Sequence, residues 1–265
     1  MYRPPLTRVA VARHPGGTFF DSVATEVPVA MVYNGVSHAV MLATPTDLDD
    51  FALGFSLTEG IVASPEDIFD IEVDARTEGI ELRIEIASRQ MQRLSEHRRS
   101  LAGRTGCGLC GAEQLSQVVR PLPTLPQESH AQRLSTGALQ RAHASLRDHQ
   151  PLFSETGAVH AAAWANRAGE ILAVREDVGR HNALDKLVGF LRRSRVALDQ
   201  GFLLMTSRAS FEMVHKAASQ QIGLLAAVSA PTSLAIETAE GLGVTLIGFV
   251  RNDSFTIYSH ALRIV

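Results

Sequence analysis

The sequence predicts an α/β protein in which helices cover a β-sheet. Beyond residue 158, segments patterned as strands alternate with segments patterned as helices, and this alternation is typical of a sheet with helices packed on it. The first hundred residues predict a separate group of strands and helices. Between the two groups, the stretch 121–126 reads Pro-Leu-Pro-Thr-Leu-Pro, which suits neither a helix nor a central strand. We therefore expect a boundary between two parts of the chain at this connector.

Turn chemistry and periodicity predict the elements before the connector. Asn34-Gly35 is the strongest kind of short hairpin signal. Leu48, Phe51 and Phe55 recur at i, i+3 and i+7, which predicts a helix with one buried stripe. The strands are expected at 27–33, 37–43, 71–75 and 80–86, and the helices at 45–61 and 90–101.

Polar residues follow four of the strands predicted beyond the connector. Open α/β sheets bind ligands at the carboxyl ends of their strands. Two or three of these polar loops also open a helix, whose free N–H groups form a natural cradle for phosphate. The strands are expected at 158–164, 170–174, 202–206, 224–228, 244–250 and 255–258, the helices at 180–193, 210–222 and 232–241, and the polar loops at 175–182, 206–210, 229–233 and 251–254.

The polar residues of these loops also have structural interpretations, which the sequence leaves open. The charges at 175–180 could form a local salt-bridge network, and the hydroxyls around Pro231 are natural helix caps. A histidine could be a packed, hydrogen-bonded residue as well as a general acid or a phosphate donor. The residues for which both a structural and a functional interpretation stay open are Arg180, His160, His181, His215, Ser229, Thr232 and Ser233.

All the thiol chemistry of the chain belongs to Cys107 and Cys110, its only two cysteines, in the segment Arg-Thr-Gly-Cys-Gly-Leu-Cys-Gly at 104–111. The thiolate is the reactive form, and both Arg104 and the N-terminal end of a helix expected at 112–119 favour it. Glycine-rich loops run over protein surfaces, where a cysteine is accessible to reaction partners. This combination suits a thiol that must visit two partners.

Other uses of two cysteines remain open. They could form a structural disulfide, fill space in the core, or supply half of a zinc site completed by His143 or His149. A redox dithiol that cycles as a disulfide is the main chemical rival.

Composition excludes several function classes. The net charge of −3 argues against bulk affinity for nucleic acid or anionic lipid. The start of the chain has no apolar signal region, no run approaches the roughly 20 apolar residues of a membrane span, and two cysteines are few for a secreted scaffold. We therefore expect a cytoplasmic protein with no membrane partner. The G-x-S-x-G, G-x-x-x-x-G-K-[ST] and H-E-x-x-H motifs are absent from the sequence.

Taken together, these segments resemble the FdhD family of formate dehydrogenase accessory sulfurtransferases. The run Arg-Glu-Asp-Val-Gly-Arg-His-Asn-Ala-Leu-Asp-Lys at 175–186 is close to diagnostic. The matching segments are 26–29, 33–35, 51–60, 104–111, 156–162, 175–189, 206–218, 229–236 and 248–258.

The resemblance implies a fold and an activity. It implies a cytidine-deaminase-like, three-layer domain at 126–265, a smaller α+β domain at 1–125 that ends in the C-x-x-C loop, and a homodimer. A cysteine desulfurase would pass sulfur to Cys107 as a persulfide, with Cys110 as a relay or resolving thiol. The sulfur would then reach the molybdenum cofactor, bis-molybdopterin guanine dinucleotide, for use by formate dehydrogenase.

The resemblance also implies cofactor contacts, with GDP as a mimic of the cofactor's nucleotide end. The guanine end would lie near Phe249, Val250, Arg251, Asn252, Asp253 and Ser254, and the phosphates near His160, Arg180, His181, Arg208, Ser229, Thr232 and Ser233. Deaminase chemistry is not expected, because the sequence has no H-x-E followed by P-C-x-x-C.

Two departures from the family pattern stand out. Ala158 occupies a position where many relatives have glycine, and Arg251 is followed by Asn252 and Asp253 where relatives can be more basic.

The rival functions are a dithiol oxidoreductase and a chaperone that binds the cofactor or the dehydrogenase without transferring sulfur.

Overall fold

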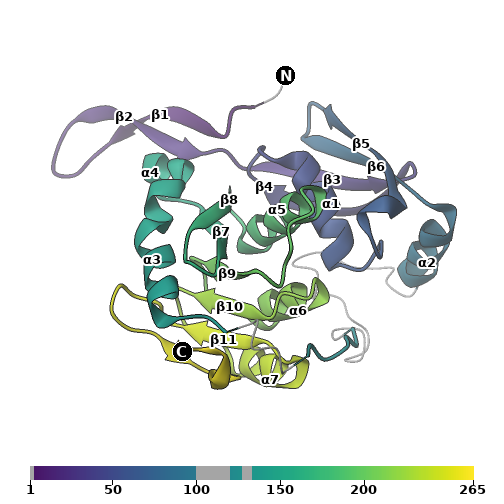
Figure 1. Cartoon of the computed structure of the whole chain (residues 1–265). Coiled ribbons are helices and arrows are strands. Elements are labelled where there is room, and N and C mark those ends of the chain that lie inside the picture. Colours follow the sequence, from purple (N-terminus) through teal and green to yellow (C-terminus); the bar gives the residue numbers. More distant parts are fainter. Residues whose placement is uncertain (1–2, 100–119, 127–132) are drawn as a thin grey trace.

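The computed structural model describes residues 3–99, 120–126 and 133–265. It is a mixed α/β structure with three sheets among these residues (Figure 1). The strands are β1 (Leu6–Ala12), β2 (Thr18–Ala24), β3 (Val27–Tyr33), β4 (Val36–Ala43), β5 (Ile68–Ala75), β6 (Ile80–Ile86), β7 (His160–Asn166), β8 (Ile171–Asp177), β9 (Gly201–Met205), β10 (Leu224–Ala227), β11 (Thr245–Gly248) and β12 (Thr256–Ile257). The helices are α1 (Leu48–Thr58), α2 (Ser88–Arg99), α3 (Thr136–Leu146), α4 (Pro151–Thr156), α5 (Arg180–Arg193), α6 (Phe211–Ser219) and α7 (Ser233–Leu242).

The six-stranded sheet has the order β12-β11-β10-β9-β7-β8. β9, β10 and β11 are parallel, and β7 runs antiparallel to both of its neighbours, so β8 points the same way as β9. The central strands are continuous apolar runs, as expected for strands covered on both faces. On one face Leu203 and Leu225 pack with α5, α6 and α7, and on the other face Leu204 and Ala226 pack with α3.

The four-stranded sheet has the order β4-β3-β6-β5 and packs on α1. The predicted Asn34-Gly35 hairpin joins β3 to β4, and both turn residues have positive φ, 46° and 79°, as a type I′ turn requires. Phe51 and Phe55 of the predicted stripe are buried in this core. The helix itself is shorter than expected, Leu48–Thr58, because Asp47 before its start and Gly60 after its end both have positive φ, 51° and 69°.

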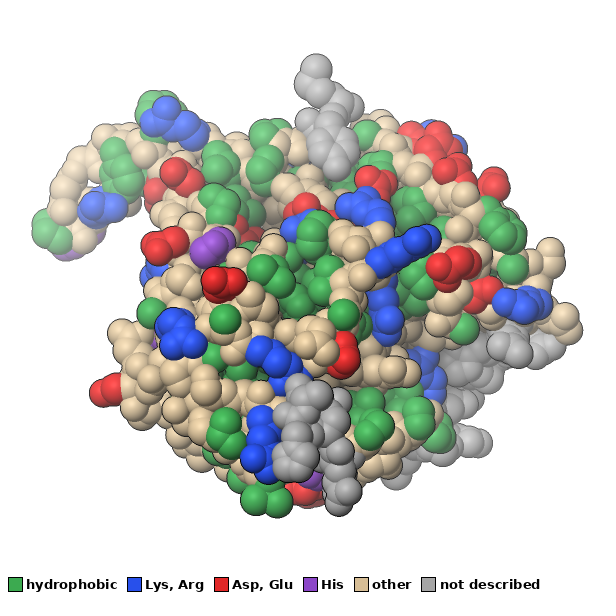
Figure 2. All heavy atoms as spheres, in the orientation of Figure 1, with side chains coloured by type: hydrophobic (Ala, Val, Ile, Leu, Met, Phe, Trp, Pro, Cys, Tyr) green, Lys and Arg blue, Asp and Glu red, His purple; other side chains and the backbone are tan. Residues whose placement is uncertain are grey.

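Some elements were not predicted. The β1–β2 hairpin projects from the body of the molecule (Figures 1 and 2), and most of its residues are exposed or half-buried on both faces. Without one buried face its sequence does not alternate cleanly between apolar and polar residues. Helices α3 and α4 were also not predicted. The connector at 121–126 contains neither helix nor strand, as expected.

Helices α1 and α5 pack in backbone contact at Gly54 and Gly189. A Cβ on Gly54 would overlap the carbonyl of Asp185, and a Cβ on Gly189 would overlap the carbonyl of Asp50. Any side chain at either position would therefore push the two helices apart. α1 belongs to the core of the four-stranded sheet and α5 to that of the six-stranded sheet, so this contact joins the two cores.

Gly189→Ala is therefore expected to destabilise the protein by about 3 kcal/mol or more, because the added methyl meets backbone atoms that cannot move alone. The matched control is Gly241→Ala in α7, where a Cβ meets nothing within 4 Å. That change should stabilise the protein by roughly 0.5–1 kcal/mol, since alanine is the better helix former. Urea unfolding of both variants measures the difference. Equal stability of the two variants would contradict the close α1–α5 contact.

No helix in the described part of the chain is long and apolar enough to cross a membrane. The division into domains at residue 126 stays a prediction. Leu125 N donates to Leu242 O at 2.9 Å, and Arg263 Nη2 donates to Pro126 O at 2.9 Å. The connector is therefore bound to the part of the chain that follows it.

Candidate functional site

The four polar loops predicted from the sequence meet at one edge of the six-stranded sheet (Figure 1). The carboxyl ends of β8, β9, β10 and β11 lie along this edge, and β7 begins there. Backbone hydrogen bonds join the segments that follow β9, β10 and β11: Thr232 N donates to Ala209 O at 3.0 Å, and Phe249 N donates to Ser229 O at 3.2 Å. The edge is therefore one continuous surface built from separate segments of the chain.

His160, Arg180 and His181 form the basic part of this edge. His160 is half-buried at the start of β7, where it pairs in register with Asp177. Burial lowers the pKa of His160, and the nearby positive charges of Arg180 and His181 lower it further against the opposing effect of Asp177. Arg180 and His181 therefore act electrostatically on the His160 ring at this edge.

Arg180 is the first residue of α5, and its Nε is buried without a hydrogen-bond partner in the described part of the chain. A buried guanidinium nitrogen without an acceptor is unfavourable. At the N-terminal end of a fourteen-residue helix, an anion would satisfy both this nitrogen and the helix dipole.

Glu212 is a residue of the site that the sequence analysis missed. It lies in the first turn of α6, and its Oε2 is 2.5 Å from His181 Nε2. Burial raises the pKa of Glu212, but the hydrogen bond from His181 and the charges of His181, Arg180 and Lys216 outweigh burial and lower it. Glu212 lies 31 positions after His181, inside the matching segment 206–218, and an acidic residue at the start of a predicted helix was the only available signal.

The start of α6 presents Arg208 and Ser210. Arg208 is exposed in the loop after β9. Ser210 is the N-cap of α6, yet its hydroxyl makes no capping bond, and the buried Oγ has no partner within the residues that the structure describes. A second helix N-terminus with an orphaned donor therefore faces the same edge as Arg180.

The hydroxyls after β10 divide between two roles. Thr232 is the N-cap of α7 and accepts a hydrogen bond from Ala235 N at 3.3 Å, so capping accounts for it. Ser233 is the exposed first residue of α7, and Ser229 is half-buried in the loop. These two positions are consistent with the predicted phosphate contacts.

The segment 249–254 places its residues in different environments. Phe249 is 44% exposed, with φ of 52°, whereas Val250 is fully buried, so only its backbone can meet a ligand. Arg251 Nη1 donates to Val228 O and Val250 O, which holds the arginine against its own loop and the end of β10. Asn252 Oδ1 lies 3.0 Å from His143 Nδ1 on α3.

The last two residues of this segment, Asp253 and Ser254, are exposed. The backbone N–H of Arg251 donates to Ser254 O at 2.8 Å and closes the loop. The predicted contacts of the guanine end thus lie on an exposed turn beside the carboxyl end of β11.

Asp177 and Lys186, from the diagnostic run, form part of the scaffold beneath the edge. Both side chains are completely buried, with Lys186 Nζ 2.7 Å from Asp177 Oδ2. Asp177 accepts hydrogen bonds from Thr44 N, Gly179 N and Asn182 Nδ2 at 2.8–2.9 Å. These bonds hold the loop that leads into α5 and tie it to the end of β4.

Arg175 and Glu176 are also structural. Arg175 donates to Asp50 Oδ2 from Nε and Nη2 at 3.0 and 2.8 Å, and Glu176 accepts hydrogen bonds from Leu152 N and Phe153 N at the start of α4. The salt-bridge interpretation is therefore correct for Arg175 but does not account for Arg180.

Lys216 and Asp185 form a second buried ion pair, between α6 and α5. Lys216 Nζ lies 3.0 Å from both oxygens of Asp185, 2.6 Å from Glu59 Oε1 and 2.9 Å from Thr58 Oγ1. Three contacts with carboxylate oxygens raise the pKa of Lys216 despite its burial. The ammonium group therefore stays charged and joins α6 to α5 and to the end of α1.

Cys107, Cys110 and Arg104 lie outside the described residues, as does the helix expected at 112–119. The chain is described again from Arg120, which is anchored between two elements. Arg120 Nη2 donates to Thr58 O at 3.1 Å, and His215 Nε2 lies 2.8 Å from Arg120 O. His215, a candidate general acid or phosphate donor in the sequence, therefore serves to hold Arg120 instead. Burial lowers its pKa, which favours the neutral ring donating to this carbonyl.

The histidines considered for a zinc site make other contacts. His143 pairs with Asn252, and His149 Nδ1 lies 2.9 Å from Ser145 O. Within residues 3–99, 120–126 and 133–265, no group of three His, Cys, Asp or Glu side chains is arranged to hold a metal ion.

Comparison with known proteins gives a consistent assignment. The model of the FdhD/NarQ family matches residues 24–265. A protein of Variovorax paradoxus (strain S110) named "Sulfur carrier protein FdhD" is 57% identical over 244 residues, which cover 92% of this chain and 87% of the relative. A Cupriavidus necator protein of the same name is 54% identical over 264 residues, 98% of this chain and 91% of the relative.

A solved structure supports the fold. The crystal structure of a putative formate dehydrogenase accessory protein from Desulfotalea psychrophila aligns with a TM-score of 0.74 over 98% of both chains, at 24% sequence identity. The family model and the relatives each cover most of the sequence. The chain therefore belongs to the FdhD/NarQ family.

Proposed function

We propose that this protein is a sulfurtransferase that carries persulfide sulfur on Cys107 from a cysteine desulfurase to the molybdenum cofactor used by formate dehydrogenase. The relatives named sulfur carrier proteins support the sulfur-transfer role. The structural observation that carries the proposal is the sheet edge where Arg180 Nε and Ser210 Oγ lie buried without described partners at two helix N-termini. Such an edge suits the phosphates of a dinucleotide.

The loading step follows thiol–disulfide exchange logic. The Cys107 thiolate attacks the terminal sulfur of the donor's persulfide, a new S–S bond forms on Cys107, and the donor cysteine leaves as a thiolate. Cys110 is the second thiol of the loop, with a relay or resolving role.

The cofactor is the bound substrate in this proposal. Its phosphates lie against the starts of α5, α6 and α7, near Arg180, Arg208 and Ser233, and its guanine end lies near 249–254. The exposed ring of Phe249 offers a surface on which a base can stack. We also infer that the protein works as a cytoplasmic homodimer and that its larger sheet follows the cytidine-deaminase arrangement without deaminase chemistry.

Chain length permits one cysteine segment to serve both ends of the helices. Arg120 follows Cys110 by ten residues, which span at most about 35 Å. α5 has 14 residues and is about 21 Å long. A thiol tethered at Arg120 therefore has enough covalent reach to meet a donor at one end and the cofactor at the other.

The experiment that tests the proposal is intact mass after incubation with a cysteine desulfurase and cysteine. We expect a reducible gain of one sulfur atom, which peptide mapping places on Cys107. A loss of two hydrogens that links Cys107 to Cys110 would instead identify a dithiol oxidoreductase. No mass change of either kind would favour a cofactor-binding chaperone.

Arg180→Gln tests the placement of the phosphates. We expect this change to weaken GDP binding by about tenfold, because it removes a charge-assisted contact at a helix N-terminus. Arg141→Gln on α3, where the arginine donates to Ala168 O, is the control and should leave the affinity unchanged. Isothermal titration calorimetry measures both. Unchanged GDP affinity in Arg180→Gln and in Arg208→Gln would show that the phosphates bind elsewhere.

A further inference from the structure

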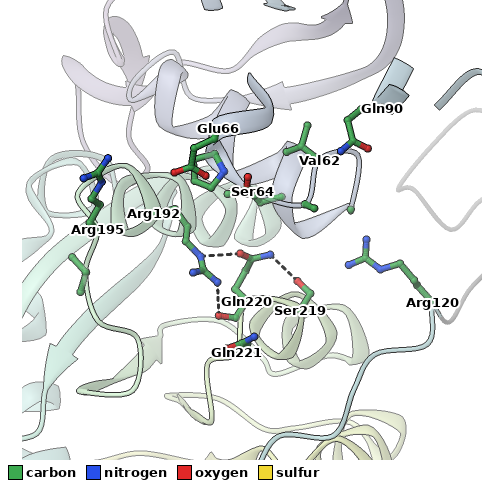
Figure 3. Close-up of a pocket in the computed structure, with 15 residues that line it drawn as sticks. Val62, Ser64, Glu66, Gln90, Arg120, Arg192, Arg195, Ser219, Gln220 and Gln221 are labelled. Atoms are coloured by element: carbon green, nitrogen blue, oxygen red, sulfur yellow. Dashed lines mark hydrogen bonds between the residues drawn. The ribbon is translucent and has the colours of Figure 1, made fainter. Parts of the chain in front are cut away.

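A pocket of about 750 Å³ is lined by the C-terminal ends of α5 and α6, by the end of α1 and by the segment 62–66 that follows α1 (Figure 3). α5 and α6 begin at the candidate functional site, at Arg180 and Phe211, and end at this pocket. The pocket is therefore separate from the sheet edge that we assign to the cofactor, and lies roughly 20 Å along α5 from it.

Positive charge exceeds negative charge among the described residues that line the pocket. Arg120, Arg192 and Arg195 line it, with Glu66 as the carboxylate. Arg192 is half-buried, and burial lowers its pKa. Among the described residues, no carboxylate forms an ion pair with Arg192. Lys and Arg side chains also gather around the end of α5 in Figure 2. The excess of positive charge in the lining therefore favours a negatively charged ligand.

The guanidinium of Arg192 is held in position. Nε donates to Gln220 Oε1 at 3.1 Å, and Nη2 donates to Gln220 O at 2.8 Å. Gln220 Nε2 in turn donates to Ser219 Oγ at 3.2 Å, so the three side chains form the chain of bonds in Figure 3. These bonds cap the end of α6 and leave Nη1 of Arg192 for an acceptor in the pocket.

Two lining residues adopt a backbone conformation in which glycine is favoured. Arg195, just after α5, has φ of 53°, and Gln221, just after α6, has φ of 63°. Glycine is the usual residue at such helix ends. An arginine and a glutamine at these positions therefore place polar side chains beside the pocket at a conformational cost.

We propose that this pocket binds an acidic peptide segment of the protein that supplies the sulfur. The cations are spread across the pocket, with Arg120 and Arg195 on opposite sides in Figure 3, so one small anion cannot meet all of them. An extended chain with several carboxylates can. Gln221 and Ser64 also line the pocket and can bond to a peptide backbone.

The position of the pocket fits a sulfur donor. Arg120, in its lining, lies ten residues after Cys110, within a covalent span of about 35 Å. A donor seated here would present its persulfide within reach of the cysteines and leave the cofactor edge free. This assignment of the partner rests on the proposed sulfur-transfer function.

Fluorescence anisotropy with labelled peptides tests the binding. The probe is a fluorescein-labelled peptide of alternating Asp and Glu, and its Asn and Gln counterpart is the neutral reference. We expect the wild-type protein to bind the acidic probe at least about tenfold more tightly than the neutral one at low salt. Arg192→Gln and Arg195→Gly should each weaken acidic-probe binding by about three- to tenfold.

The variants separate binding from folding. Arg195→Gly removes the cation and relieves the left-handed backbone, so its melting temperature should be unchanged or higher. Arg193→Gln is the matched control: it lies in the same turn of α5 with the same change of charge, but Arg193 pairs with Asp50 at 2.6 Å and lies outside the pocket lining. Equal weakening in Arg193→Gln, or equal binding of the acidic and neutral probes, would overturn the proposal.

Sulfur loading tests the assignment of the partner. With a desulfurase and cysteine, Arg192→Gln and Arg195→Gly should acquire sulfur on Cys107 more slowly than the wild type, whereas glutathione persulfide should load all variants equally. An unchanged rate from the desulfurase in both variants would refute a donor in the pocket. If neither donor loads wild-type Cys107, both the sulfur-transfer function and the assignment of the donor are refuted. The peptide affinities separately measure whether the pocket binds an acidic segment.

Discussion

Cys107→Ala is expected to abolish sulfur loading and to reduce activation of formate dehydrogenase by roughly 100-fold or more, because the variant lacks the attacking thiolate. GDP affinity should be unchanged, since the residues assigned to the nucleotide lie on other segments, at Arg180 and 249–254. Activity of a formate dehydrogenase matured with each variant, together with calorimetry of GDP binding, measures both quantities. Their separation would establish that the cysteine transfers sulfur and does not help to bind the nucleotide.

Cys110→Ala is the matched comparison, because it removes the other thiol of the same glycine-rich loop. We expect this variant to keep a persulfide on Cys107. Equal loss of activity in both variants, with a Cys107–Cys110 disulfide in the wild type, would instead support dithiol redox chemistry. Full activation by Cys107→Ala would identify a chaperone and refute sulfur transfer.

Lys216→Met is expected to destabilise the protein by about 3–5 kcal/mol, because it leaves the Asp185 carboxylate buried without its cation. For a chain of this size the melting temperature should fall by roughly 10 °C. Asp185→Asn combined with Lys216→Met should recover part of the loss, since the amide carries no charge. Denaturant unfolding of the single and double variants provides the measurement.

The loss in Lys216→Met should also depend on pH. Burial raises the pKa of Asp185, and Lys216 is the largest influence that lowers it, so removal of the lysine raises this pKa further. A carboxyl with a raised pKa in the folded state favours folding at low pH and loses that advantage as the pH rises through the folded pKa. The difference from the wild type should therefore be smaller at pH 5 than at pH 8. A difference that grows as the pH falls would show that Asp185 is not the group left uncompensated.

Sequence reasoning located the polar loops that form the sheet edge of the candidate site. Polar residues directly after apolar strands predicted the loops at 175–182, 206–210, 229–233 and 251–254, and the structure brings these loops to one sheet edge. This worked because the parallel order of β9, β10 and β11 follows from the alternation of strands and helices, and parallel strands place their carboxyl ends together.

The roles of individual side chains within those loops were harder to predict. Glu212 pairs with His181, and His215 holds Arg120 across 95 positions of sequence. Val250 lies in a polar segment yet is fully buried. In each case the surrounding side chains or the bonded atom come from another element. The residues adjacent in the sequence therefore do not indicate the contact.

By itself the sequence determined the family resemblance, the α/β class, the Asn34-Gly35 hairpin and the segments that carry polar residues, because each depends on residues close together in the chain. Only the tertiary structure decided that Arg180 and Ser210 keep orphaned polar atoms, that Lys216 is enclosed by carboxylates, and that a cationic pocket lies at the far end of α5 and α6. The physical reason is that burial and pairing depend on how the helices pack on the sheet. Turn preference and periodicity act within one element and cannot specify that packing.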